Sequence, residues 1–170
     1  MNPSRDIKIS KVTLNIGAGK DQTKLDKGIK LFKSITNINP VKTITSKRIP
    51  GWGLRPGLPI GCKVTLRRKN AIELLKRLLQ AKDNKLKESQ FDPNGNIAFG
   101  IEEYIDIPGV KYDPEIGIIG LEVCVTLERN GFRIKRRKIA KKKVPKKHMI
   151  TKQESIDFMK KKFNIELEDE

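Results

Sequence analysis

Residues 60–68 constrain the fold most strongly, because their side chains alternate between two chemical classes. In an extended strand, successive side chains point to opposite faces of the sheet. One face of this segment is apolar and the other carries glycine, cations and a hydroxyl: Ile60, Cys62, Val64 and Leu66 against Gly61, Lys63, Thr65 and Arg67. Such a strand belongs to a sheet that is covered on one face and open on the other.

Similar periodicities along the rest of the chain predict how this sheet is completed. Asn130-Gly131 is a strong hairpin signal and predicts a returning strand over residues 132–137. Alternation predicts further strands at residues 11–16, 41–46 and 121–128, and a strand pair or bent strand at 97–107. Helical spacing predicts helices at residues 21–37 and 71–79, and a last helix that the capping box of Thr151 and Glu154 opens.

The charge of the chain is large and unevenly distributed. There are 37 Lys and Arg against 20 Asp and Glu, which gives a net charge of +17. Residues 42–69 hold eight cations and no acid, and residues 133–147, here called the basic segment, hold ten cations and no acid. The balance reverses over residues 82–115, with eight acids against four Lys. Segregated positive charge is typical of a protein that binds a nucleic acid, because cations displace the counterions of phosphates.

Strands and helices do not alternate strictly along the chain, which favours the α+β class. We expect two layers, with a mostly antiparallel sheet and helices on one face, plus a basic C-terminal arm and a terminal helix. Residues 1–138 are predicted to form a single α+β RNA-binding domain that includes a flexible loop at residues 46–59. Residues 139–170 are predicted to form the basic arm and the C-terminal helix.

The loop carries the chain's single Trp among glycines, prolines and cations. Three Pro and three Gly fall within residues 49–59, which excludes a helix or a central strand there. Trp52 has two interpretations at this point: its ring stacks on an exposed base or sugar, or it folds back and anchors the loop on the core.

Catalytic and metal-binding motifs are poorly represented. His148 is the only histidine, and we expect it to face RNA or solvent rather than act as a general base. Cys62 and Cys124 lack the spacing of a zinc site, and residues 17–20 lack the spacing of a phosphate-binding loop. We therefore expect no enzyme, no cofactor, no metal and no small-molecule substrate. The alternative functions are an RNA-modifying protein and an RNA-binding protein of another class.

The sequence also argues against a membrane as the partner of the positive charge. No stretch approaches the ~18 consecutive apolar residues of a membrane span, and no apolar region of a signal peptide follows Met1. Binding to an anionic membrane surface would require a basic amphipathic helix, whereas Pro145 interrupts the basic segment. The sequence predicts a cytoplasmic protein.

Several motifs resemble, in order, the L5 family of large-subunit ribosomal proteins. The resemblance covers residues 8–137, and the run from Val125 through the lysine-rich arm and closing helix is similar to the archaeal branch. The motifs are Leu14-Asn15-Ile16-Gly17, residues 40–46, residues 51–57, residues 59–67, residues 91–96, Gly100-Ile101, Ile107-Pro108 and Tyr112-Asp113.

This resemblance implies a two-layer α+β protein of the central protuberance, without catalysis or a cofactor. It implies that the sheet face binds 5S rRNA and helps to attach it to the large subunit. The long loop would reach P-site tRNA, and another surface would contact a small-subunit head protein at an intersubunit bridge.

The expected contact residues follow from the resemblance and the charge together. On the sheet, the candidates for 5S rRNA contact are Lys11, Thr13, Asn15, Lys63, Thr65 and Arg67. In the basic segment, the candidates for contact with large-subunit rRNA, assigned from charge, are Arg133, Lys135, Arg136 and Arg137. In the loop, the candidates for tRNA contact are Lys47, Arg48, Trp52, Gly53, Leu54 and Arg55.

Overall fold

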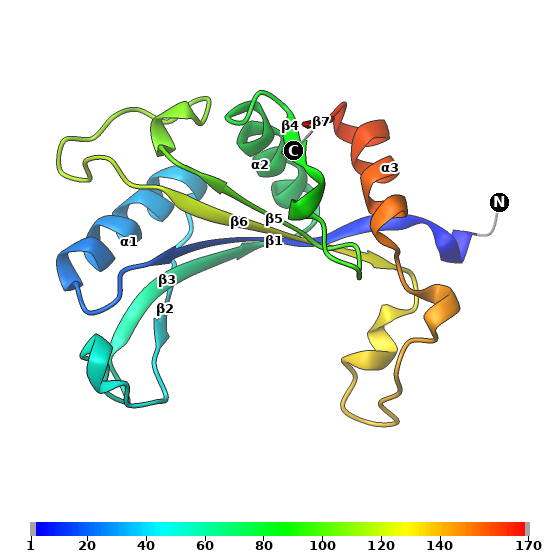
Figure 1. Cartoon of the computed structure of the whole chain (residues 1–170), viewed down its shortest axis with the longest axis horizontal. Helices are drawn as coiled ribbons and strands as arrows, with labels where there is room; N and C mark the ends of the chain where they lie inside the picture. Colours follow the sequence, from blue (N-terminus) through cyan, green and yellow to red (C-terminus); the bar gives the residue numbers. More distant parts are fainter. Residues whose placement is uncertain (1–2, 169–170) are drawn as a thin grey trace.

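The computed structural model describes residues 3–168 and has an antiparallel five-stranded sheet at its centre, with strand order β2-β3-β1-β6-β5. Figure 1 shows α1, α2 and α3 on the same side of this sheet. The expected α+β class is confirmed. The elements are β1 (Ile7–Gly17), α1 (Gln22–Thr36), β2 (Val41–Ile44), β3 (Pro59–Leu66), α2 (Arg68–Gln80), β4 (Lys85–Lys87), β5 (Ile97–Ile101), β6 (Leu121–Arg129), α3 (Lys152–Phe163) and β7 (Glu166–Glu168).

Alternation along the strands builds the hydrophobic core between the sheet and the helices. The expected pattern of β3 is confirmed from Cys62 on, because Cys62, Val64 and Leu66 are buried while Lys63 and Thr65 are exposed; at its start Ile60 is half-buried and Gly61 is buried. The neighbouring strands contribute Val12, Leu14 and Ile16 from β1 and Val123, Val125 and Leu127 from β6. The helix α2 covers them with Ala71, Leu74, Leu75, Leu78 and Leu79.

The helix α1 begins and ends where its capping residues place it. Asp21 has an extended backbone and its carboxylate accepts hydrogen bonds from the backbone N–H groups of Thr23 and Lys24. Asn37 closes the helix in the left-handed conformation, with its N–H bonded to the carbonyl of Lys33. These two caps satisfy backbone groups that the helix ends leave free.

The returning strand expected after Asn130-Gly131 is wrong. Gly131 does adopt a positive φ of 92°, but Phe132–Lys135 then forms a 3-10 helix and Phe132 is buried. The strand β6 already pairs with β1 on one edge and β5 on the other. The strand β5 pairs only with Leu121–Val125, and beyond that stretch Phe132 packs into the hydrophobic core as the chain turns away from the sheet.

The C-terminal helix packs on the same core as the sheet. Ile156, Met159 and Phe163 of α3 belong to the main hydrophobic cluster. The Ser155 hydroxyl donates a hydrogen bond of 2.9 Å to the carbonyl of Gly95, and β7 pairs in parallel with β4. The division of the chain at residue 138 stays a prediction.

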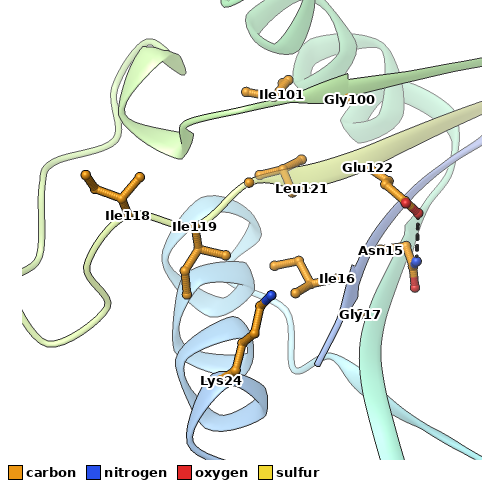
Figure 2. Close-up of a pocket in the computed structure, with 11 residues that line it drawn as sticks. Asn15, Ile16, Gly17, Lys24, Gly100, Ile101, Ile118, Ile119, Leu121 and Glu122 are labelled. Carbon is orange, nitrogen blue, oxygen red and sulfur yellow. Dashed lines mark hydrogen bonds between the residues drawn. The ribbon is translucent and has the colours of Figure 1, made fainter. Parts of the chain in front are cut away.

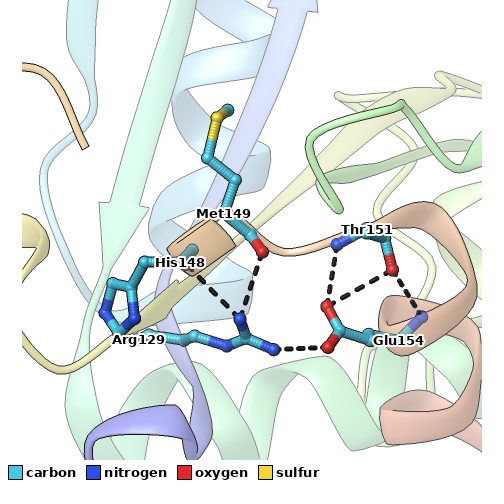
Figure 3. A network of polar contacts seen from close by, with 5 residues as sticks. All are labelled: Arg129, His148, Met149, Thr151 and Glu154. Carbon is cyan, nitrogen blue, oxygen red and sulfur yellow. Dashed lines mark hydrogen bonds and ion pairs between the residues drawn. The ribbon is translucent and has the colours of Figure 1, made fainter. Parts of the chain in front are cut away.

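Arg129 joins the end of β6 to the start of α3 (Figure 3). Its side chain is 5% exposed, and Nη1 donates to the carbonyl of Met149 at 3.1 Å while Nη2 lies 2.6 Å from Glu154 Oε1. The other carboxylate oxygen of Glu154 accepts from the backbone N–H of Thr151, and the Thr151 hydroxyl accepts from the N–H of Glu154. The expected capping box is therefore confirmed, and an arginine braces it from outside the helix.

Candidate nucleic-acid interface

The face of the sheet opposite α1 and α2 is uncovered and carries the polar rows that the sequence predicts. The register places Thr13 beside Thr65 and Asn15 beside Lys63. The hydroxyl oxygens of Thr13 and Thr65 lie 3.4 Å apart. The structure thus brings together side chains that lie about fifty residues apart in the chain.

The remaining predicted cations extend these rows. Lys11 precedes Thr13 on the same face of β1 and is half-buried. Arg67 follows β3 with an extended backbone, at φ −138° and ψ 165°, and its side chain is exposed. The positive charge of the sheet therefore gathers on β3 and β1.

A third row on β6 was missing from the sequence prediction. Thr126 lies opposite Lys11, Cys124 opposite Thr13, and Glu122 opposite Asn15. The open face consequently holds a carboxylate as well as cations. Glu122, Cys124 and Thr126 alternate with the apolar residues of 121–128, so the sequence places them on the other face of their strand. Which strand they lie beside becomes clear only from the pairing of β6 with β1.

Glu122 is held in place by its neighbour. The Asn15 side-chain amide donates a hydrogen bond of 2.9 Å to Glu122 Oε2. Burial raises the pKa of the Cys124 thiol, and the nearby Glu122 carboxylate raises it further. At neutral pH the thiol is uncharged, so Cys124 presents a small neutral surface on this face.

A hollow adjoins this pair where β1 and β6 separate. Figure 2 shows the Asn15–Glu122 pair at one side and Ile118, Ile119 and Lys24 at the other. The hollow has a volume of about 450 Å³. Its lining is mostly apolar, and it runs from the Asn15–Glu122 pair toward Lys24 in the first turn of α1.

The loop at residues 46–59 has its own hydrogen bonds. The backbone groups of Ile49 and Leu54 bond to each other at 3.0 and 3.1 Å, around the 3-10 turn Pro50–Trp52. Gly53 closes this turn with a φ of 66°, a left-handed conformation that glycine adopts without strain.

Two hydrophobic side chains of the loop, Trp52 and Leu54, differ sharply in exposure. Trp52 is 70% exposed, which excludes the interpretation that its ring folds back on the core and leaves the ring free to stack on a partner. Leu54 is 7% exposed and is the buried hydrophobic side chain of the loop. Its side chain is therefore not accessible for tRNA contact, whereas the three cations of the loop, Lys47, Arg48 and Arg55, are exposed.

The basic segment forms a closed loop rather than a strand. The backbone N–H of Lys142 donates to the carbonyl of Ile134 at 3.2 Å, and Arg137 Nε donates to the carbonyl of Ala140 at 2.8 Å. Figure 1 shows this segment and the loop around Trp52 extending from the two ends of the sheet, both on the side away from the helices. The four predicted contacts are exposed or half-exposed at the surface of this loop: Arg133, Lys135, Arg136 and Arg137.

His148 lies at the base of this loop, where it is only partly open to solvent and also has contacts within the protein. Its ring is half-buried, with Nε2 2.8 Å from the carbonyl oxygen of Asn130. The ring also contacts Phe132 edge-on, with centroids 5.7 Å apart. Its neighbours give His148 a structural role that local composition does not predict.

Within residues 3–168, no helix has the length and hydrophobicity that a membrane span requires. In the same part of the chain, no three His, Cys, Asp or Glu side chains come together as ligands for a metal ion.

Comparison with known proteins identifies the family. Residues 2–55 match the family model described as ribosomal protein L5, and residues 59–158 match the model of the C-terminus of the same ribosomal family. The chain is 47% identical to large ribosomal subunit protein uL5 of Sulfolobus acidocaldarius, over 96% of this chain and 92% of that protein. It is 50% identical to uL5 of Nanoarchaeum equitans, over 98% of both chains, and 45% identical to uL5 of Methanosphaera stadtmanae, over 99% and 100%.

These matches confirm the resemblance to the archaeal branch, and they agree with the α+β sheet and its open face. The chain belongs to the ribosomal protein L5 family, whose members are non-enzymatic structural components of the large ribosomal subunit.

Proposed function

We propose that the open face of the sheet binds 5S rRNA and helps to attach it in the central protuberance. The observation that carries this proposal is the pairing of the Lys11, Thr13 and Asn15 row with the Lys63 and Thr65 row on an uncovered surface. The exposed cations of the basic segment are proposed to contact the large-subunit rRNA beside it.

The chemistry of these side chains suits folded RNA. The major groove of A-form RNA is too deep and narrow for side chains, so a sheet face meets phosphates, 2′-hydroxyls and exposed loop bases. Threonine and asparagine donate hydrogen bonds to phosphate and sugar oxygens. Lysine and arginine contribute affinity through counterion release, which makes binding depend on salt.

We further propose that the loop at residues 46–59 contacts P-site tRNA and that a separate surface contacts a small-subunit head protein at an intersubunit bridge. The exposed ring of Trp52, flanked by cations, supports the first. The acid-rich residues 82–115 offer a surface for a protein partner with the opposite charge.

Replacing Lys63 and Arg67 together with alanine tests the binding of 5S rRNA. We expect the double variant to bind isolated 5S rRNA about ten- to thirtyfold more weakly at moderate salt, because two phosphate contacts are lost. The slope of log K against log salt should flatten by about 1.4, at roughly 0.7 per contact. Filter binding over a salt series measures both quantities.

The matched control removes the same charge from the opposite side of the molecule. Lys33 on α1 and Lys76 on α2 are exposed, and the double variant K33A/K76A should retain the wild-type affinity and slope. Equal losses in the two double variants would show that net charge, rather than the sheet face, determines binding.

Replacing Trp52 with alanine separates the loop from the sheet. We expect 5S rRNA binding to stay within about twofold of wild type, since the ring lies outside the sheet rows, and tRNA binding to ribosomes that carry the variant to weaken by about three- to tenfold. The readout is tRNA retention in the P site during filter binding. A loss of 5S rRNA binding in this variant would contradict the assignment of the loop to tRNA.

A further inference from the structure

Ile139 is the most exposed large hydrophobic side chain among residues 3–168, at 82%, and it lies in the middle of the basic segment. We propose that Ile139 packs against the face of an unstacked base in the large-subunit rRNA. The inference rests on the proposed contact between the basic segment and that rRNA. It adds an apolar contact that depends on an exposed base face rather than on phosphate charge.

The loop holds Ile139 outward by its own hydrogen bonds. Arg137 Nε donates to the carbonyl of Ala140, and Ala140 itself has a positive φ of 52°, which turns the chain directly after Ile139. The two branched side chains nearer the ends of the loop behave differently. Ile134 is half-buried, and Val144 packs partly against the core. The outward position of Ile139 thus belongs to a defined turn at the tip of the loop.

The surroundings of Ile139 favour RNA as its partner. The residues on either side are exposed cations: Arg136, Arg137, Lys138, Lys141, Lys142 and Lys143. This density of positive charge repels other basic protein surfaces and attracts phosphates. When these cations bind phosphates, Ile139 is placed against the RNA surface, where only an apolar part of the RNA is a favourable contact for its side chain.

An RNA duplex offers little apolar surface, because its grooves expose phosphates, 2′-hydroxyls and polar base edges. Base faces are accessible only where stacking is interrupted, at loops, bulges and helix ends. Apolar side chains insert beside such bases and select deformable sites, while cations position the protein. Ile139 therefore fits an unstacked base flanked by phosphates.

Binding to isolated large-subunit rRNA tests the proposal with an affinity and a salt slope. We expect I139A to bind about three- to tenfold more weakly with an unchanged slope, because an apolar contact is lost and no charge is removed. I139L and I139M should stay within about twofold of wild type. The charge variant K141A/K142A should flatten the slope, which shows that the assay detects the loop.

Ile38 is a matched control, because it is also an exposed isoleucine, at 41%, and lies just after α1, outside the basic segment and the open sheet face. I38A should bind like wild type. Wild-type affinity in I139A would overturn the proposal, as would a changed slope, since that result would place the effect in the cations.

Photo-cross-linking identifies the partner directly. A benzoylphenylalanine at position 139 in assembled large subunits should cross-link to large-subunit rRNA at an unpaired nucleotide. A cross-link to a protein, or to a fully paired helix, would overturn the proposal. The proposed function is tested independently, since K63A/R67A acts on isolated 5S rRNA and can lose binding whatever Ile139 does.

Discussion

Gly61→Ala is expected to lower the free energy of unfolding by about 2–3 kcal/mol, although it adds only a methyl group, because Gly61 is buried between β1 and β2. A Cβ at this position would lie 2.6 Å from the carbonyl oxygen of Ile16 and 3.0 Å from the Thr43 hydroxyl. The first of these atoms belongs to the backbone of β1, so the clash can be relieved only by moving β1 away from β3. Chemical denaturation followed by circular dichroism measures the loss.

The same displacement of β1 from β3 should also weaken RNA binding by the sheet face. Gly61 lies two residues before Lys63, which pairs with Asn15, so separating the strands moves the two polar rows apart. Gly100 is the control, because it also lies on the open face but a Cβ there meets no atom within 4 Å. G100A should lose less than about 1 kcal/mol. Equal losses in both variants would place the cause in strand propensity rather than in the contact with Ile16.

Arg129→Ala is expected to destabilise the protein by about 2–3 kcal/mol, mainly by releasing α3 from β6. The substitution removes a buried guanidinium and leaves the carbonyl of Met149 and one oxygen of Glu154 without their donor. The loss stays below the usual cost of breaking a buried ion pair, because the Glu154 side chain is 43% exposed and water can solvate it. Hydrogen exchange should show the largest loss of protection in α3.

The pH dependence of stability separates the carboxylate from the rest of this contact. Burial raises the pKa of Glu154, but hydrogen bonds from Thr151 and the charge and hydrogen bond of Arg129 outweigh it and hold the pKa below its ordinary value of 4.5. The carboxylate therefore stabilises the fold at neutral pH, and this contribution is lost as pH falls below 4.5 through the lowered pKa. The difference in the free energy of unfolding between wild type and Glu154→Gln should therefore shrink as the pH is lowered. A difference that stays constant with pH would contradict this account.

The elements that could be predicted are those that local chemistry determines. The alternation of β3 sets its buried and exposed faces, and Asp21 and Asn37 set the ends of α1. Neither result depends on distant parts of the chain. The polar rows on β1 and β3 could be predicted for the same reason, since each side chain's face follows from its position along the strand.

The features that could not be predicted depend on neighbours that are remote in sequence. Gly131 turns the chain as expected, but residues 132–135 form a 3-10 helix instead of a strand, and Phe132 packs into the core that distant elements build. The parallel pair of β4 and β7 consists of three-residue strands, which are too short to show a period. Whether Trp52 or Leu54 turns inward depends on tertiary packing, and composition treats both as hydrophobic loop residues.

The Glu122 carboxylate on β6, which accepts a hydrogen bond from Asn15, makes the charge of the open face uneven, with cations on β3 and an acid on β6. A phosphodiester placed over Glu122 would meet a like charge, whereas the same group over Lys63 or Arg67 would meet an opposite one. An RNA strand on this sheet must therefore run with its phosphates along β3 and turn hydrogen-bond donors, such as 2′-hydroxyls or base amino groups, toward β6. In the proposed complex, repulsion at this one acidic position would restrict the orientation of the RNA on the sheet.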